Sequence, residues 1–360
     1  MESLEIRGKV LNFPAFFPDA TFGFVRGVDI KEVVNAGIKG LVVNAYHLLS
    51  LAGEINKKNG IGNYMGFPGV IISDSGGFQL MSLIHDLKSG EINDKGATFF
   101  IDTKKILLTP ENCVKLQILI NSDIVMCLDD CTRPNISLKE QEDSVKRTIA
   151  WARRCKSEFD KLTENLSKKE KPLIFGIIQG GNDFNLRKKC ADELIKIGFD
   201  GYAFGGFPVD KNGSFLHELL EYTSNLIPEN KIKYAMGIGK PEDIVFCVKI
   251  GYNLFDCVIP TREARNNRLY SFKKNLFGKL KKLDKDGNFY EYVRIRNLDN
   301  KDNKNPISKM CDCFACKNFS RAHIYKFFKE KNPYWIKLAT IHNLRFYSTL
   351  MERLMEKQLK

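Results

Sequence analysis

The chain has 360 residues, of which 43% are hydrophobic and 28% charged, and its formal charge at pH 7 is +13. This composition is typical of a soluble globular protein, and no apolar run approaches the ~20 residues that a membrane span requires. The N-terminus, MESLEIRGKV, lacks the apolar core of a signal peptide. We therefore expect a cytoplasmic protein that is neither secreted nor membrane-spanning.

The basic excess is confined to the last quarter of the chain. Residues 262–360 contain 24 Lys and Arg against 10 Asp and Glu, whereas residues 1–261 are close to neutral. Such an asymmetry describes the partners of a protein rather than its fold, and it favours nucleic acid. The alternative is a lysine-rich solvated surface without a partner.

Short apolar runs that end near Gly, Asn or Asp recur along the chain. Their near-continuous hydrophobicity is typical of strands buried on both faces. The predicted strands are Phe13–Phe17, Leu41–Asn44, Val70–Ser73, Ile124–Leu128, Leu173–Ile178, Gly201–Phe204, Lys233–Met236 and Leu254–Val258. Helical patterns lie between several of them, at Asp29–Ile38, Thr109–Ile120, Ser137–Phe159, Phe184–Ile197, Phe215–Leu226 and Pro241–Ile250.

Eight strands that alternate with helices predict an α/β fold, namely a (β/α)8 TIM barrel. The alternative is a doubly wound open sheet. That fold is disfavoured because no glycine-rich phosphate-binding fingerprint follows the first strand.

The carboxyl ends of the predicted strands carry carboxylates, amides and glycines. They are Asn44 with Tyr46 and His47, Asp74, Asp129 with Asp130, Gln179 with Gly180 and Gly181, Gly205 with Gly206, Met236 with Gly237, and Asp256. In a parallel barrel these ends form one mouth, where active sites lie. Glycines let backbone N–H groups approach a flat ligand closely. The set predicts a pocket for a planar, hydrogen-bonding substrate such as a nucleobase.

Three of these groups, Asp74, Asp129 and Asp256, are carboxylates at one mouth. Displacement at an anomeric carbon passes through an oxocarbenium-like transition state, and one carboxylate can trap that carbon while a second group transfers protons. The alternative role is capping of strand ends, which is common for one Asp but not for three. The three arginines that follow Asp256, at positions 262, 265 and 268, place this chemistry beside a polyanion.

The cysteines divide into two groups. Seven of the ten are scattered through apolar or helical contexts, as expected for reduced thiols in the cytosol. The other three, Cys311, Cys313 and Cys316, are clustered, and His342 follows them. Three thiolates and one imidazole predict a closed tetrahedral site for one structural Zn²⁺ ion. His323 is the alternative fourth ligand.

These features predict three parts of the chain. Residues 1–270 form the barrel with the active site, residues 271–341 form a small C-terminal zinc-binding subdomain, and residues 342–360 form a helix that packs back on the barrel.

The motifs of the chain together resemble the tRNA-guanine transglycosylase (queuine tRNA-ribosyltransferase) family in its bacterial form. The matching segments are NAYHL at 44–48, SDSGGFQ at 73–79, LTPENCVKLQ at 108–117, SDIVMCLDDC at 122–131, GIIQGG at 176–181, GYAFGG at 201–206, YAMGIGKPEDI at 234–244, FDCVIPTREARN at 255–266, CDCFACKNFSRA at 311–322 and TIHNLRFY at 340–347. They run nearly from end to end, and several are long and distinctive.

The resemblance implies a pentosyltransferase of queuosine biosynthesis that acts on tRNA. The enzyme would exchange guanine at the wobble position of GUN anticodons for a 7-deazaguanine base, by a double displacement through a covalent Asp–ribose intermediate that needs no ATP. Asp256 matches the nucleophile of the family, and Asp74 matches its general acid/base. The target guanine must leave its stack to reach the pocket.

The resemblance also implies roles in binding. Asp129 matches the carboxylate that accepts hydrogen bonds from the base, and Gln179 and the N–H of Gly206 match the groups that read its carbonyl oxygen. Phe78 and Met236 match the pair between which the base stacks. The remaining implied residues are Phe207 for the base, Arg262, Arg265 and Arg268 for RNA, and Cys311, Cys313, Cys316 and His342 for zinc.

The incoming base is assigned less directly. Val209 and Cys131 resemble the bacterial form, which uses 7-aminomethyl-7-deazaguanine (preQ1), and preQ1 is therefore favoured over queuine. Lys211, however, stands where an acid usually supports recognition of the aminomethyl group. Two further departures from the family pattern are Ala45 in place of Thr and Asn267 in place of Gly.

Other functions compete with this one. The same reaction could use queuine directly, or a 7-deazaguanine could be exchanged into DNA. A non-catalytic RNA-binding subunit is a further alternative, but the presence of both Asp74 and Asp256 argues against it. A zinc-bearing glycoside hydrolase would not need the basic last quarter. The resemblance implies a homodimer.

Overall fold

The computed structural model describes residues 1–77, 84, 90–101, 104–134, 136–273 and 289–358. Its centre is a sheet of eight parallel strands in the order β3-β13-β12-β11-β10-β9-β5-β4. Their bounds are β3 Ala15–Pro18, β4 Gly40–Asn44, β5 Val70–Asp74, β9 Ile124–Met126, β10 Leu173–Ile178, β11 Gly201–Phe204, β12 Ile232–Ala235 and β13 Leu254–Cys257.

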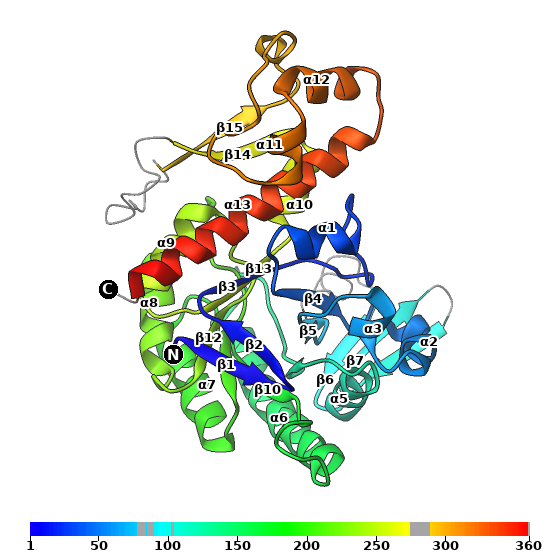
Figure 1. Cartoon of the computed structure of the whole chain (residues 1–360). Helices are drawn as coiled ribbons and strands as arrows, with labels where there is room; N and C mark the ends of the chain where they lie inside the picture. The colour runs from blue at the N-terminus through cyan, green and yellow to red at the C-terminus, as the bar shows by residue number, and fades with distance from the viewer. Residues whose placement is uncertain (78–83, 85–89, 102–103, 135, 274–288, 359–360) are drawn as a thin grey trace.

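The two edges of this sheet meet. Asp19 and Val42 form a parallel bridge beyond the end of β3, and the N–H of Ala20 donates to the carbonyl of Val42 at 2.7 Å. The sheet is thereby closed into a (β/α)8 barrel (Figure 1). All eight predicted strands are confirmed to within two residues, because a strand buried on both faces must be apolar almost throughout.

The six predicted helices are also confirmed. They are α1 Ile30–Asn35, α5 Pro110–Leu119, α6 Leu138–Thr163, α7 Phe184–Ile197, α8 His217–Leu226 and α9 Pro241–Lys249. Thr109 caps α5 by accepting a hydrogen bond from the N–H of Asn112, and Ser137 caps α6 in a capping box with Glu140. The α6 helix continues four residues past its predicted end at Phe159 and ends at the buried Thr163, whose hydroxyl donates to the carbonyl of Phe159 at 2.8 Å.

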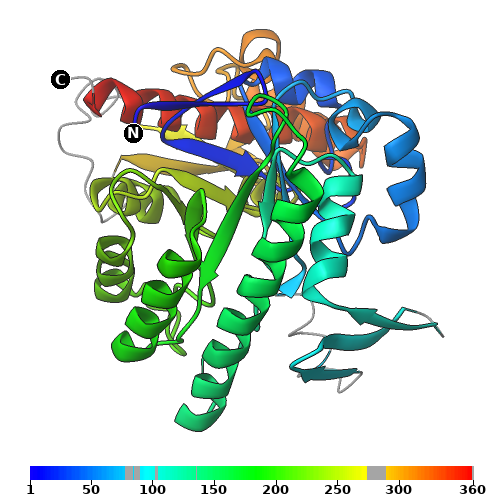
Figure 2. The same cartoon turned by 90° about the horizontal axis from the view of Figure 1, so that it is seen from below.

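Two small antiparallel sheets in the barrel part of the chain were not predicted, and neither was the ribbon of the accessory region described below. The hairpin of β1 (Ser3–Ile6) and β2 (Lys9–Asn12) packs Ile6 and Leu11 against the side chains that fill the barrel. The second sheet consists of β6 (Gly90–Asn93), β7 (Gly96–Ile101) and β8 (Lys104–Leu108), and Figure 2 shows it standing out from the barrel. The connection after β4 also holds the short elements η1 Leu49–Leu51, α2 Ala52–Lys57 and α3 Ile61–Met65.

The accessory region follows α10 (Ile259–Arg265) and is built on a two-stranded antiparallel ribbon. Its elements are β14 Arg268–Phe272, β15 Tyr290–Arg294, η4 Leu298–Asn300, α11 Phe314–Asn318 and α12 Arg321–Lys329. The last helix, α13 (Tyr334–Gln358), begins beside α12 and runs back along the barrel to α9 (Figure 1). The predicted boundary between residues 341 and 342 falls inside this one helix, and the division into parts stays a prediction.

Within the described part of the chain, the structure has no helix that is both long enough and apolar enough to span a bilayer.

Candidate active site

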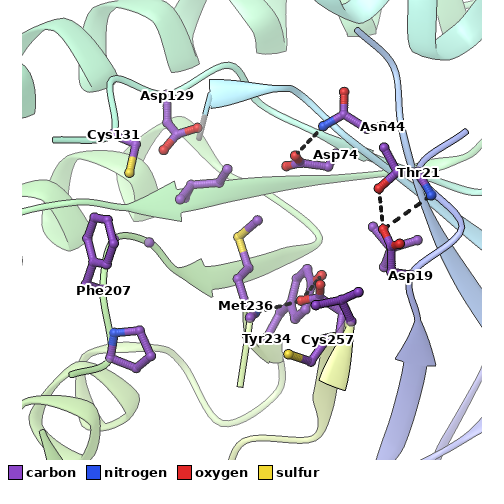
Figure 3. Close-up of a pocket in the computed structure, with 18 of the residues that line it drawn as sticks. Asp19, Thr21, Asn44, Asp74, Asp129, Cys131, Phe207, Tyr234, Met236 and Cys257 are labelled. Carbon is purple, nitrogen blue, oxygen red and sulfur yellow. Dashed lines mark hydrogen bonds between the residues drawn. The ribbon is translucent and has the colours of Figure 1, made fainter. Parts of the chain in front are cut away.

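A cavity of about 400 Å³ opens at the carboxyl ends of the barrel strands. Its lining includes nine residues that the strand ends or the family motifs predicted: Asn44, Asp74, Asp129, Gln179, Gly205, Gly206, Met236, Gly237 and Asp256. In Figure 3 the cavity has two ends, with Asp129, Cys131 and Phe207 at one and Asp19, Asn44 and Asp74 at the other. The described structure thus brings the predicted groups together at one mouth.

Asp256 is held by donors from the neighbouring strand β12 and the turn after it. Its Oδ1 accepts hydrogen bonds from the hydroxyl of Tyr234 and from the N–H of Gly237, both at 2.8 Å. Gly237 has φ +71°, a conformation that glycine adopts without strain. Burial raises the pKa of Asp256 to about 6, opposed by these two hydrogen bonds and assisted by the charge of Asp19. The carboxylate is therefore ionised and fixed in orientation at neutral pH.

Asp74 lies at the end of β5, and its Oδ2 accepts a hydrogen bond from Asn44 Nδ2 at 3.0 Å. Burial and, after it, the charge of Asp256 together raise its pKa to about 6, opposed by hydrogen bonds from the N–H groups of Gly76 and Ser75. The two carboxylates are thus coupled electrostatically. Both have pKa values close to the pH at which a proton must be exchanged, as general acid/base chemistry requires.

The opposite end of the cavity is organised by Asp129 and Gln179. Both side chains are buried, and Gln179 Nε2 donates to Asp129 Oδ2 at 2.6 Å. Burial raises the pKa of Asp129 to about 7, although the hydrogen bond from Gln179 lowers it. Two glycines allow this close packing: a Cβ at Gly77 would lie 2.4 Å from Asp129 Oδ1, and one at Gly205 would lie 2.6 Å from Gln179 Nε2. The pair presents an acceptor and an amide to a planar ligand.

A buried arginine that the sequence analysis missed supports the glycine turns. Arg187 on α7 donates to the carbonyls of Ile178, Gly181 and Gly205 at 2.9, 2.9 and 3.0 Å. Its guanidinium carbon lies 4.0 Å from the ring centroid of Phe204. Burial lowers the pKa of Arg187 to about 10, so it remains charged at neutral pH. Nothing in the sequence separates it from the other charged residues of α7.

Asp19, Thr21 and Tyr234 line the cavity and were also missed. Asp19 and Thr21 follow β3, and the hydroxyl and N–H of Thr21 both donate to Asp19 Oδ1. Tyr234 lies on β12 with its hydroxyl on Asp256. Asp19 could have been found as another carboxylate near a predicted strand end, whereas the inward direction of Tyr234 depends on the register of β12.

Some predicted positions lie elsewhere. Phe78 is outside the described residues. Asp130 is buried in an ion pair with Arg147 Nε at 2.8 Å and does not line the cavity. Val209 is half-buried and forms a bridge with Phe215, and it is likewise not among the lining residues. Cys131 and Phe207 do line the cavity.

The three predicted RNA-binding arginines have different surroundings. Arg262 on α10 is exposed, and Arg265 is half-buried. Arg268 on β14 donates from Nη2 to Glu263 Oε1 at 2.7 Å, which offsets part of its charge. Asn267 has φ +53°, the left-handed conformation that Asn tolerates better than most residues, and this accounts for Asn in place of Gly. The RNA-binding role of the three stays a prediction.

The predicted metal ligands form one cluster. The ligand atoms of Cys311, Cys313, Cys316 and His342 all lie within 4.8 Å of one another. His342 Nδ1 is 3.3 Å from Cys316 Sγ, and its Nε2 is 2.6 Å from the carbonyl of Tyr270. That carbonyl orients the ring so that Nδ1 faces the thiolates, as is usual for metal-binding histidines.

His323, the alternative ligand, lies outside this cluster. Its Nδ1 instead accepts a hydrogen bond from the N–H of Ser320 at 3.3 Å in the capping box of α12. His342 is therefore the fourth member of the candidate metal site.

Comparison with known proteins gives matches over nearly all of this chain. The family model described as queuine tRNA-ribosyltransferase matches residues 1–357. The chain is 38% identical over 349 residues to the queuine tRNA-ribosyltransferase of Actinobacillus pleuropneumoniae serotype 3, covering 96% of this chain and 85% of the relative. It is 39% identical over 345 residues to the proteins of the same name from Haemophilus ducreyi and Shewanella sediminis, covering 95% of this chain and 84% and 85% of those relatives.

Proposed function

Because the chain belongs to the queuine tRNA-ribosyltransferase family, we propose that it exchanges guanine in tRNA for a 7-deazaguanine base in queuosine synthesis. The family membership confirms what the motifs predicted. The observation that carries the mechanism is the coupled pair of Asp74 and Asp256 at one end of a cavity whose other end holds Asp129 and Gln179. A ribose fits beside the first pair when a guanine is read by the second.

The first displacement releases guanine. A carboxylate oxygen of Asp256 attacks C1′ of the target ribose and forms an ester-like bond as the C1′–N9 bond breaks. The electron pair of that bond goes to the departing base, which is protonated by Asp74. The hydrogen bonds of Tyr234 and Gly237 hold the nucleophile in its line of attack.

The second displacement installs the new base. Asp74, now ionised, removes the proton from the incoming base, whose nitrogen attacks C1′ and breaks the bond to Asp256. Two displacements retain the configuration at C1′, and no ATP is consumed. The pKa values of Asp74 and Asp256, both raised to about 6, support these roles: Asp256 can be ionised at neutral pH, and its charge favours the protonated form of Asp74 beside it.

The base is held by groups at the other end of the cavity. Asp129 accepts from the N–H groups of the base, Gln179 and the N–H of Gly206 bind its carbonyl oxygen, and Met236 stacks on one face with Phe78 on the other. Cys131 and Phe207 border this end, and Cys131 together with Val209 resembles the form of the family that uses preQ1. We therefore favour preQ1 over queuine.

The loop after Phe207 has one acid, Asp210. It lies one position before residue 211, where the family usually has an acid. Its carboxylate Oδ1 accepts from the N–H groups of Asn212 and Ser214, both at 2.8 Å. Lys211 is exposed. Recognition of the aminomethyl group of preQ1 would therefore rest on this loop's backbone rather than on an acid at position 211.

We further propose one structural Zn²⁺ ion held by Cys311, Cys313, Cys316 and His342. The chemistry of the donor set supports zinc, which favours thiolate and imidazole ligands in tetrahedral geometry. The ion would tie α11 to α13. Arg262, Arg265 and Arg268 would contact the RNA backbone, and the enzyme would act in the cytoplasm as a homodimer, which sedimentation of the zinc-loaded protein can test.

The proposed function is tested by exchange of radiolabelled guanine into unmodified tRNA with a GUN anticodon. We expect label to enter with the wild-type protein, to be displaced by preQ1, and not to enter with Asp256→Asn. Asp299→Asn, which changes an exposed aspartate of the accessory region, is the matched control and should retain exchange.

Three outcomes would change the proposal. Displacement by queuine and not by preQ1 would leave the reaction standing and overturn the choice of base. Entry of label into DNA but not tRNA would reassign the substrate. Exchange by Asp256→Asn at the wild-type rate would contradict the assigned nucleophile.

A further inference from the structure

Two exposed phenylalanines stand at the edge of the catalytic mouth. Phe22 and Phe24 are 39% and 55% exposed and directly follow Asp19 and Thr21, which line the cavity. They lie in the loop after β3, where the N–H of Gly23 donates to the carbonyl of Ala20 at 2.8 Å and closes a turn. Apolar rings exposed to water beside the entrance of this cavity suggest that a ligand covers them.

The two rings are anchored to the core by a series of aromatic contacts. The ring centroids of Phe24 and Phe22 are 6.3 Å apart, with an interplanar angle of 28°. Phe22 lies 4.7 Å from His47, His47 lies 4.9 Å from Tyr46, and Tyr46 lies 5.0 Å from the buried ring of Phe99. The exposed rings therefore belong to a supported platform, which we call the aromatic platform (Phe22, Phe24 and His47).

Positive charge surrounds the aromatic platform. The guanidinium carbon of Arg26 lies 5.3 Å from the ring centroid of Phe22. Burial lowers the pKa of Arg265, and the nearby charge of Arg26 lowers it further. Asp19 opposes this effect, and Arg262 adds a smaller lowering. Among the described residues, Arg265 Nη1 is a buried donor with no hydrogen-bond partner. The site thus combines ring faces with Arg26, Arg262 and Arg265, for which the described part of the chain shows no salt bridge to a carboxylate.

Rings interleaved with arginines are the chemistry that binds single-stranded nucleic acid. Each base has a face that stacks on an aromatic ring, and each phosphate pairs with a cation. When the target guanine leaves its stack, the neighbouring base loses a stacking partner. A ring at the rim of the cavity would replace that partner and hold the strand in its extruded conformation.

Resting on the proposed tRNA substrate, we propose that Phe22 and Phe24 stack an unpaired anticodon-loop base adjacent to the extruded guanine. Arg26 and Arg265 bind the phosphates that flank this base. The aromatic platform is thus a second base site, distinct from the cavity that holds the exchanged base, and it contributes to tRNA binding rather than to selection of the incoming base.

Photochemical cross-linking tests the contact directly. An anticodon stem-loop RNA carries 5-iodouridine at the nucleotide either before or after the target guanine, since this probe reacts with an aromatic ring on which it stacks. We expect irradiation of the zinc-loaded wild-type protein to join one of the two RNAs to the peptide that contains Phe22 and Phe24. Attachment of both probes only to peptides outside the aromatic platform would overturn the proposal.

Kinetics of variants supply a second readout. Loss of one stacked base weakens binding about tenfold, so Phe22→Ala should raise the KM for tRNA by about that factor. Phe22→Trp should restore the KM because it keeps a stacking ring, and the KM for guanine should show no comparable rise in either variant. Equal tRNA KM values for Phe22→Ala, Phe24→Ala and the wild type would contradict the proposal.

The matched control is Phe184→Ala. Phe184 is 41% exposed at the start of α7, after β10, which lies on the opposite side of the barrel from β3. We expect this variant to keep the wild-type KM for tRNA. Because wild-type guanine exchange is measured in the same series, a failure of the proposed function would show as no exchange at all, whereas failure of the stacking proposal would leave exchange intact.

Discussion

At the scale of single residues, the site depends on three carboxylates whose pKa values are raised by burial. Strand ends were enough to predict Asp74, Asp129 and Asp256, because a parallel barrel gathers those ends at one mouth. They were not enough to predict Tyr234 or Arg187. Those two act through side-chain direction and burial, which depend on strand register and helix packing rather than on a local pattern.

Removal of the Tyr234 hydroxyl should alter the pH dependence of exchange. That hydroxyl lowers the pKa of Asp256, so Tyr234→Phe should raise it. Because the nucleophile must be ionised, kcat should fall at low pH and its acidic limb should move to higher pH by about one unit, corresponding to the loss of one hydrogen bond to a charged group. A pH–rate profile measures this. An unmoved acidic limb would show that another group controls it.

Asp129→Asn should stabilise the protein at alkaline pH while weakening base binding. The folded-state pKa of Asp129 is raised to about 7, so its contribution to folding is favourable below about pH 4 and is lost as the pH rises through 7. An amide cannot ionise and avoids that loss, which at about 1.4 kcal/mol per pKa unit should increase the free energy of unfolding at pH 8 by roughly 4 kcal/mol. Urea unfolding at pH 8 and pH 4 would check it, with no gain expected at pH 4.

At the scale of elements, helix α13 links the accessory region to the barrel. Asn343, buried in this helix, accepts from the N–H of Tyr270 and donates to the carbonyls of Pro260 and Arg268, all at 3.0 to 3.1 Å. His342 beside it carries the imidazole of the candidate metal site. The arginine-bearing segment after Asp256 is therefore held in place by the same helix that supplies one member of that site.

Loss of a metal ligand should detach these elements from one another. Cys316→Ser should abolish stoichiometric zinc, lower the melting temperature and raise the KM for tRNA, because the bond between α11 and α13 is lost. Zinc content by atomic absorption and thermal unfolding would measure this. Cys247→Ser, at a buried cysteine of α9 far in sequence from the cluster, is the control and should keep its zinc. A zinc-free wild-type protein of equal stability would contradict a structural role.

The elements that sequence could predict are those with a strong periodic signal. All eight barrel strands carry continuous apolar runs, and the capped helices α5 and α6 begin at the predicted residues. The strands β6 to β8 were missed because they are partly exposed and pair only with one another, within a single connection of the chain. The hairpin of β1 and β2 was missed for a related reason. Its Ile6 and Leu11 are buried because they pack against the side chains that fill the barrel, and its own sequence carries no strong periodic pattern.

At the scale of the whole molecule, the charge distribution should govern tRNA binding. The basic last quarter includes the accessory region, so the affinity for tRNA should fall steeply with salt while the affinity for guanine should not. Arg262→Ala should reduce the slope of log affinity against log salt by about 1. Lys146→Ala, which removes an exposed charge on α6, is the control and should leave the slope unchanged. Equal slopes for both variants would place Arg262 away from the RNA.

The covalent intermediate is the centre of this account, and trapping it is the most direct test. Wild-type protein is incubated with tRNA without added base, quenched in denaturant, digested with nuclease and protease, and examined by mass spectrometry. We predict a protein–RNA adduct that survives denaturation, with the ribose attached to the peptide that contains Asp256, and none in Asp256→Asn. An adduct on Asp74, or efficient guanine exchange without any adduct, would contradict the double displacement at Asp256.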